Sequence, residues 1–396
     1  MTTYFIIFFS FFILALITKP YSVLLAPPLD NKLPIVNRPS NTTFFVVFII
    51  CVIFIGLRFN VGGDFGAYRY MYTLYVDDTL LQAISFRYQS TDAGFALLNW
   101  FVTLFDPYDK IMWNNNQYRV GGYVLVNLLG AAIFSYTFLK LVFSLPRPFL
   151  ALTVAFPYLI LVVAIGYVRQ GIALGFLCYA LVALMENKKL FFIILVLFAA
   201  AFHKTAIIML PLLFYTTIDN KFLVIAISVA SLFVLILATV AEQADLMVTN
   251  YLVHSMQSRG GQLRLAINII PALFYFRYRK KFPFTAIEHK IITFLAITSL
   301  VLFAFVIVAP SFSTALDRLG LYFLPLQLII FSCLPDLFQG NKKVFMNSSI
   351  ILFYSLMFFV WIFFADNAYA WLPYQNILTL DHWTTEYPGL SFDPVE

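Results

Sequence analysis

Charged side chains are scarce in this chain. Only 11% of its 396 residues are Asp, Glu, Lys or Arg, whereas 62% are hydrophobic and the mean hydropathy is +0.88. A soluble domain carries about 25% charged residues, and no long polar segment is present in which a separate soluble domain could fold. Apolar stretches of roughly 17 to 25 residues recur instead, and this length spans a bilayer core. The composition predicts an all-α, polytopic integral membrane protein with a single domain over residues 1–396.

Cysteine and histidine are also few. Cys51, Cys178 and Cys333 each lie in an apolar run, and the four histidines form no HxxxH pair. Such spacing suits neither a disulfide framework nor a zinc site, so we expect no metal and no cofactor. Alternating strand patterns are missing too, which excludes an outer-membrane barrel. A nucleic-acid partner is not expected.

The apolar runs predict about twelve transmembrane helices. They lie at 4–18, 43–57, 120–140, 149–168, 171–186, 190–203, 205–218, 221–240, 264–278, 289–309, 319–338 and 344–364. An N-terminus placed outside puts 15 of the 25 Lys and Arg residues inside, including the cluster at 277–281, as the positive-inside rule expects. The segment 93–105 is too short to cross, and a crossing would move that cluster outside, so we expect it to be re-entrant or interfacial. Both termini are then outside, with an outer loop region at 58–119 and an outer tail at 365–396.

The two faces differ in the type of cation that they carry. Eight of the ten cations on the outer face are arginine, whereas 11 of the 15 on the inner face are lysine. The planar guanidinium matches phosphate and carboxylate groups with two parallel hydrogen bonds, which lysine does not offer. An arginine-rich outer face therefore favours recognition of an anionic ligand at the outer leaflet.

The stretch "LRFNVGGDFGAYRYMY" (57–72) places polar residues directly after an apolar run. Arg58, Asp64 and Tyr68 are candidate substrate contacts. The pair Gly62 and Gly63 permits a positive φ angle, and their amides could form an anion-binding nest. An interfacial loop with an Arg58–Asp64 salt bridge is the alternative.

Two further motifs interrupt apolar runs. In "GYVRQGIALGF", Arg169 is the one charged residue between Phe149 and Met185, with Gln170 beside it. A charge at membrane depth is costly and usually faces a cavity, although an arginine at a helix end can also extend to the interface.

In "AAFHKTAIIMLP", His203 and Lys204 separate two apolar helices. Histidine is the side chain most readily tuned for proton transfer near neutral pH.

The last outer motif has two parts. "SMQSRGGQLRLAIN" contains Arg259 and Arg264, and "TALDRLGLYFLP" contains Asp317 and Arg318. Arginine beside serine and glycine could converge on phosphate oxygens, whereas ordinary outer loops would explain the same residues without a ligand.

The order of these motifs resembles the EpsG/Wzy family of bacterial polysaccharide polymerases. The matching elements are R-x-x-x-G-G-D-x-x-x-Y from Arg58, D-x-G-F from Asp92, RQ, FHK-[ST]-A and DRLGLYF. The resemblance covers about half of the chain. Family members often have Thr before the aspartate and Glu-Pro before the Gly-Phe, where this chain has Gly63 and Asp92-Ala93.

The resemblance implies polymerisation of undecaprenyl-pyrophosphate-linked repeat units at the outer face of the inner membrane, assisted by a chain-length regulator. Arginines stabilise the departing pyrophosphate without a metal, and the expected ones are Arg58, Arg169, Arg259 and Arg318. His203 or Asp64 could take the proton of the acceptor hydroxyl, and His203 is the favoured base. Asp64, held ionised by a nearby arginine, would orient the acceptor. The remaining expected substrate contacts are Gly63, Tyr68, Gln170, Lys204, Arg264 and Asp317.

Other functions also fit the sequence. A flippase or transporter for the same lipid-linked sugar needs a cationic cavity, but such proteins usually show internal repeats, and we find none. A ligase shares the donor and differs in its acceptor. A membrane O-acyltransferase could use His203 but would leave the outer arginines without a purpose.

Overall fold

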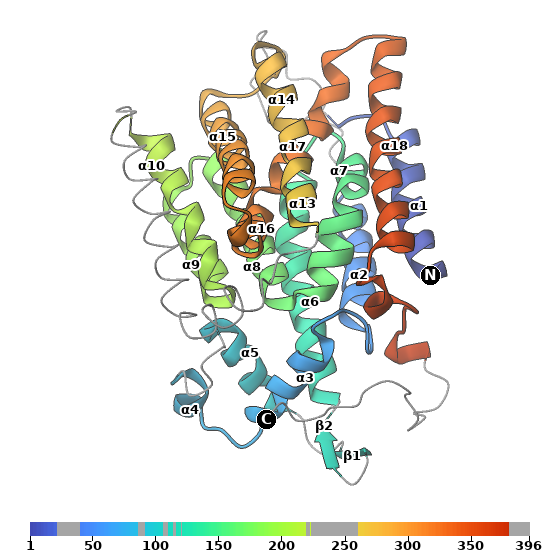
Figure 1. Cartoon of the computed structure of the whole chain (residues 1–396), viewed down its shortest axis with the longest axis vertical. Coiled ribbons are helices and arrows are strands. Elements are labelled where there is room, and N and C mark those ends of the chain that lie inside the picture. Colours follow the sequence, from blue (N-terminus) through green and yellow to red (C-terminus); the bar gives the residue numbers. More distant parts are fainter. Residues whose placement is uncertain are drawn as a thin grey trace.

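The computed structural model describes residues 1–21, 40–85, 92–105, 110–113, 116–119, 121–218, 222 and 260–379. In these ranges the chain is a bundle of helices with one short antiparallel hairpin (Figure 1). The hairpin departs from a strictly all-α fold. The expected crossing at 221–240, the candidate Arg259 and residues 380–396 of the expected tail lie outside the described residues.

The α-helices are α1 (Thr2–Ile17), α2 (Asn41–Gly56), α3 (Phe65–Leu74), α4 (Leu80–Ile84), α5 (Ala93–Thr103), α6 (Gly121–Val142), α7 (Pro148–Ala155), α8 (Val168–Met185), α9 (Lys189–Phe202), α10 (Pro211–Thr217), α13 (Gly261–Ile267), α14 (Ile269–Tyr278), α15 (Ala286–Val308), α16 (Ser313–Gly320), α17 (Pro325–Cys333) and α18 (Asn341–Phe364). The short helical segments are η1 (Phe156–Ala164), η2 (Lys204–Met209), η4 (Arg279–Lys281), η5 (Pro310–Phe312), η6 (Leu321–Phe323), η7 (Leu334–Leu337), η8 (Ala368–Trp371) and η9 (Ile377–Thr379). The strands are β1 (Lys110–Trp113) and β2 (Asn116–Arg119), with Lys110 opposite Arg119.

Several of these helices suit a bilayer. By length and composition, four helices of the described residues could span it: Gly122–Val142, Val168–Met185, Ala286–Val308 and Asn341–Phe364. The pair Ser313–Phe323 and Pro325–Leu337, bent by 43°, would make a fifth. Shorter apolar helices cover the expected runs at 4–18, 43–57, 149–168, 190–203 and 205–218, and α5 covers 93–105. The protein is therefore a helical membrane protein in which many helices are shorter than a straight crossing requires.

Local sequence signals explain where the helices begin. Thr285 and Glu288 form a capping box at the start of α15: the Glu288 amide donates to the Thr285 hydroxyl at 3.3 Å, and the Thr285 amide donates to the Glu288 carboxylate at 2.6 Å. Both bonds satisfy amides that have no partner within the helix. Proline occupies the first turn of α7, α10 and α17, where its missing N–H costs nothing.

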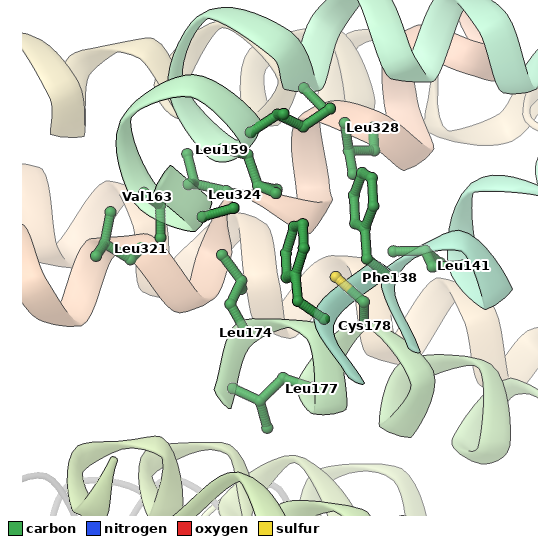
Figure 2. Packing of buried hydrophobic residues seen from close by; sticks show 14 of the residues in the cluster. Phe138, Leu141, Leu159, Val163, Leu174, Leu177, Cys178, Leu321, Leu324 and Leu328 are labelled. Carbon is green, nitrogen blue, oxygen red and sulfur yellow. The ribbon is translucent and has the colours of Figure 1, made fainter. Parts of the chain in front are cut away.

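The core lies where α6, η1, α8 and α17 meet. Figure 2 shows Phe138 and Leu141 of α6 beside Leu174 and Cys178 of α8, with Leu328 of α17 nearby. All three cysteines of the chain are buried and free, as the apolar runs around them predict. This packing fixes α8, which carries Arg169 in its first turn.

Figure 1 shows α3, α4, α5 and the hairpin at one end of the bundle, and the end of α14 and the start of α18 at the other. The cluster 277–281 belongs to the second end, because it ends α14 and forms η4. An ion-pair network lies where α7, η7 and α18 meet: Asp336 pairs with Arg147 at 2.9 Å and with Lys343 at 2.6 Å. Cations expected inside are therefore separated along the bundle from the loop that starts at Arg58.

The segment after α18 packs against the loop that follows α2. Residues 57–59 pair with 375–377 through backbone hydrogen bonds, Phe59 to Gln375 at 3.0 Å and Ile377 to Leu57 at 2.9 Å. Trp371 is 1% exposed and donates from its indole nitrogen to the Leu161 carbonyl at 2.9 Å. The first part of the expected outer tail is thus an ordered clamp over the break between η1 and α8.

Gly166, in that break, should tolerate no side chain. A Cβ atom there would lie 2.4 Å from the Trp371 ring, and overpacking of a buried site costs about 1–3 kcal/mol. We expect Gly166→Ala to lower the thermal unfolding temperature of the purified protein in detergent by several degrees. Gly63→Ala is the matched control, because its Cβ would lie 3.6 Å from the same ring, an ordinary contact. Equal unfolding temperatures for the two variants would contradict this account of the clamp.

Candidate active site

Arg58 belongs to the scaffold of the site. Its side chain is 1% exposed, and its guanidinium donates to the carbonyls of Ile55 and Val61 and to the Asn127 side chain. Carbonyls at the end of a helix have no partner within that helix, so Arg58 satisfies the end of α2 and ties it to α6. The structure gives no support to the expected contact with a substrate, and we replace it by this structural role.

The glycine pair after Arg58 forms a turn. Gly62 has φ +105°, and its amide donates to the Ala370 carbonyl at 2.8 Å. A Cβ atom at Gly62 would also lie 2.9 Å from the Ile165 carbonyl oxygen. Because the Gly62 amide already has a partner, the expected anion nest cannot use it. Gly63 is exposed and precedes Asp64, the N-cap residue of α3.

Arg169 lies at the centre of a group of polar residues drawn from four separate segments. Its Nη1 atom lies 3.1 Å from an oxygen of Asp92, the N-cap residue of α5. The other Asp92 oxygen accepts from the backbone amide of Lys204 at 3.2 Å. Arg169 and Asp92 are 22% and 9% exposed, so solvent screens this pair less than a surface pair. One carboxylate thus joins α5, α8 and the start of η2.

Tyr68 completes one side of this group. It is buried, it packs edge-on against Phe95 with ring centroids 5.3 Å apart, and the Arg169 guanidinium lies 5.7 Å from the centre of its ring. Tyr68 therefore holds Arg169 by a cation–π contact and does not present its ring to solvent.

Asp64 lies in the field of two arginines. Burial raises the pKa of its carboxyl above the usual range, and the charges of Arg318 and Arg169 lower it without offsetting burial. The sequence argument expects the opposite direction, because it weighs the arginines and leaves out desolvation. Arg318 is exposed at the end of α16, and no carboxylate in the described part of the chain forms an ion pair with it.

His203 lies between α9 and η2 and faces the same cations. Burial is the main cause that lowers the pKa of His203 to about 3, and Arg169, Arg318 and Lys204 lower it further. Its Nδ1 atom lies 2.9 Å from the Thr205 hydroxyl, which lies 2.9 Å from the Tyr322 hydroxyl. The imidazole is therefore neutral at physiological pH and held by a chain of hydroxyl groups.

Two further candidates, Arg264 and Gln170, have different surroundings. Arg264 of α13 pairs with Asp317 of α16, its Nε atom 2.9 Å from one carboxylate oxygen, and it lies 5.9 Å from the Tyr158 ring. Its two-pronged edge is thus bound to Asp317. Gln170 is 7% exposed, and its amide nitrogen has no hydrogen-bond partner among the described residues.

The group Asp64, Tyr68, Asp92, Arg169, His203, Lys204 and Arg318 is called the polar cluster below. It joins the GGD, D-x-G-F, RQ, FHK and DRLGLYF motifs through contacts and electrostatic coupling. Sequence reasoning did not assign roles to Asp92, Thr205 or Tyr322. All three stand in the quoted motifs, so their place there was the available signal.

The described residues contain no group of three or more His, Cys, Asp and Glu side chains that could hold a metal ion. The polar cluster combines guanidinium and ammonium groups with two carboxylates and a neutral imidazole. Such a set can bind an anionic group and accept a proton nearby.

A model of the EpsG family matches residues 41–376, which span every motif of the polar cluster. Neither a search of curated proteins nor a search of solved structures found a match.

Proposed function

The chain belongs to the EpsG family, and from this premise we propose that it polymerises undecaprenyl-pyrophosphate-linked oligosaccharide repeat units. The family suggests a polymerase of the glycosyltransferase type. The observation that carries the finer proposal is the convergence of Arg169 and Arg318 on a carboxylate whose pKa is raised, Asp64, with Lys204 acting together with them on His203.

The reaction needs few groups. The acceptor hydroxyl oxygen attacks the anomeric carbon of the donor glycan, the bond from that carbon to the phosphate oxygen breaks, and undecaprenyl pyrophosphate departs. Fixed cations stabilise the charge on the departing group. Asp64 takes the hydroxyl proton and later releases it to water. This assignment replaces His203 as base, because an imidazole with a pKa of about 3 binds a proton weakly.

The setting of the reaction is part of the proposal. The chain crosses the inner membrane about twelve times, with both termini and the polar cluster outside and 277–281 in the cytoplasm. The separation of 277–281 from α3, α4 and α5 along the bundle supports this orientation (Figure 1). Its partners are the bilayer, the lipid-linked glycans and a chain-length regulator.

The competing functions predict different products. We expect the purified protein, reconstituted in vesicles with defined lipid-linked repeat units and a metal chelator, to yield a ladder of polymers and free undecaprenyl pyrophosphate. Protein-free vesicles are the control. Substrate moved across the bilayer unchanged would instead indicate a flippase. Transfer only when a different acceptor is added would indicate a ligase, and dependence on a divalent cation would contradict metal-independent catalysis.

A further inference from the structure

The tautomer of His203 can be read from two buried hydroxyl groups. Tyr322 is 0% exposed, and in the described part of the chain its hydroxyl has a single partner, the Thr205 hydroxyl at 2.9 Å. Thr205 is 6% exposed and also lies 2.9 Å from His203 Nδ1. Each hydroxyl has one proton to donate, and buried polar groups are almost always satisfied.

One arrangement uses both hydroxyl protons. Tyr322 donates to the Thr205 oxygen, and Thr205 donates to His203 Nδ1, which accepts through its lone pair. If Nδ1 carried a proton instead, it would donate to Thr205, and one of the two buried hydroxyl protons would find no acceptor among the described residues. A buried hydroxyl left without its hydrogen bond loses its hydration without a replacement, which is unfavourable. The neutral imidazole therefore carries its proton on Nε2.

The second imidazole nitrogen is open to a ligand. Nε2 makes no hydrogen bond within the described residues, and it is not among their buried unpartnered polar atoms. Lys204 adjoins His203, and Arg169 and Arg318 act on it electrostatically. An N–H group among these cations is suited to donate a hydrogen bond to an anionic oxygen. It is not suited to accept a proton from the substrate.

We infer that Thr205 and Tyr322 hold His203 in its Nε2–H tautomer, so that His203 donates a hydrogen bond to an anionic phosphate oxygen and does not act as the base. This inference rests on the proposed polymerase function for the identity of the anion. No proton leaves His203 in the reaction. The acceptor proton goes to Asp64, and the imidazole N–H, like the arginines, strengthens its bond as charge develops on the departing oxygen. His203 would contact the substrate, whereas Thr205 and Tyr322 position it.

Substitutions that mimic one nitrogen or the other test the role. The glutamine amide can place an N–H near the position of Nε2, whereas the shorter asparagine amide lies near that of Nδ1. We expect His203→Gln to retain turnover within about tenfold of wild type. His203→Asn and His203→Ala should lose about 10²- to 10³-fold, the usual loss for one donor to a developing oxyanion. Equal losses for all three variants would overturn the donor role.

The positioning residues are tested by the tautomer itself. In full-length protein labelled with 15N-histidine and held in lipid nanodiscs, the His203 signals are those missing from the His203→Gln spectrum. We expect a protonated Nε2 and an unprotonated Nδ1 at neutral pH. Thr205→Val should mix the tautomers and cut turnover about five- to tenfold, the value of roughly one hydrogen bond, and Thr205→Ser should restore most of both.

The two hypotheses fail in different ways. A protonated Nδ1 in the wild-type spectrum would overturn the inference whether or not the protein makes polymer. A wild-type protein that makes no polymer from lipid-linked repeat units, yet shows the Nε2–H tautomer, would remove the proposed function and with it the phosphate ligand. The hydroxyl chain that sets the tautomer would then stand.

Discussion

Arg169→Lys should reduce polymer formation about as severely as Arg169→Ala, by roughly 10³-fold, the upper range for loss of one preorganised donor. The guanidinium binds Asp92 at 3.1 Å and lies against the Tyr68 ring at 5.7 Å. A lysine ammonium is a point charge without the planar fork, so it cannot reproduce both contacts and still face a pyrophosphate. Polymer length and released undecaprenyl pyrophosphate, measured with purified enzyme, give the size of the loss.

Controls separate this loss from a general effect of charge. Arg277→Lys changes an exposed arginine in the last turn of α14, at the end of the bundle opposite α3, α4 and α5 (Figure 1). This variant should leave turnover unchanged. Both Arg169 variants should remain in the membrane in normal amount. Full polymer length from Arg169→Lys would show that a point charge is sufficient and would remove the argument from geometry.

Asp92 forms an ion pair with Arg169, and a double variant tests whether it acts through that pair. If Asp92 acts by holding Arg169, then Asp92→Asn combined with Arg169→Lys should cost much less than the sum of the two single losses, because residues of one network are not additive. Additive losses would mean that Asp92 serves the reaction independently of Arg169.

The sequence predicted the membrane class and most of the helices because those depend on composition and on the length of apolar runs. It predicted a division between the runs 149–168 and 171–186, but not the change from α7 to η1 within the first run or the break that ends η1 at Ala164. The close approach of Gly166 to Trp371, which lies about 200 residues away in the chain, accompanies that break. The ordered clamp at 57–59 and 375–377 depends on the same long-range contacts.

For the site, the residue types in the sequence predicted which residues belong to the polar cluster better than they predicted the role of each residue. The motifs around Asp64, Arg169 and His203 do converge, but Arg58 is buried against carbonyls and Arg264 is bound to Asp317. Nothing in a single sequence distinguishes an arginine that satisfies a helix end from one that faces a ligand. The raised pKa of Asp64 depends on burial, which outweighs the neighbouring arginines and arises only when the chain is folded. In His203, burial and the neighbouring cations lower the pKa together.

Asp64→Asn should lower the rate of polymerisation about 10²- to 10⁴-fold, the usual cost of losing a general base. Asparagine keeps the size and one oxygen of the side chain but cannot accept a proton, so binding of the lipid-linked donor should change little. Single-turnover rates with saturating substrate would separate the chemical step from binding. Asp77→Asn, an exposed substitution just beyond α3, is the matched control and should behave as wild type.

The pH dependence of the wild-type enzyme gives an independent readout of the same carboxylate. The base must be ionised to accept a proton, and burial raises the pKa of Asp64. Turnover should therefore fall as the pH is lowered through a value above the ordinary aspartate range, and the fall should be absent from the residual activity of Asp64→Asn. The neutral imidazole of His203, with its pKa near 3, adds no inflection near pH 6.5. A wild-type profile with its acid limb at 6.5 that disappears in His203→Gln would return the base role to His203, and normal turnover by Asp64→Asn would exclude Asp64 from proton transfer.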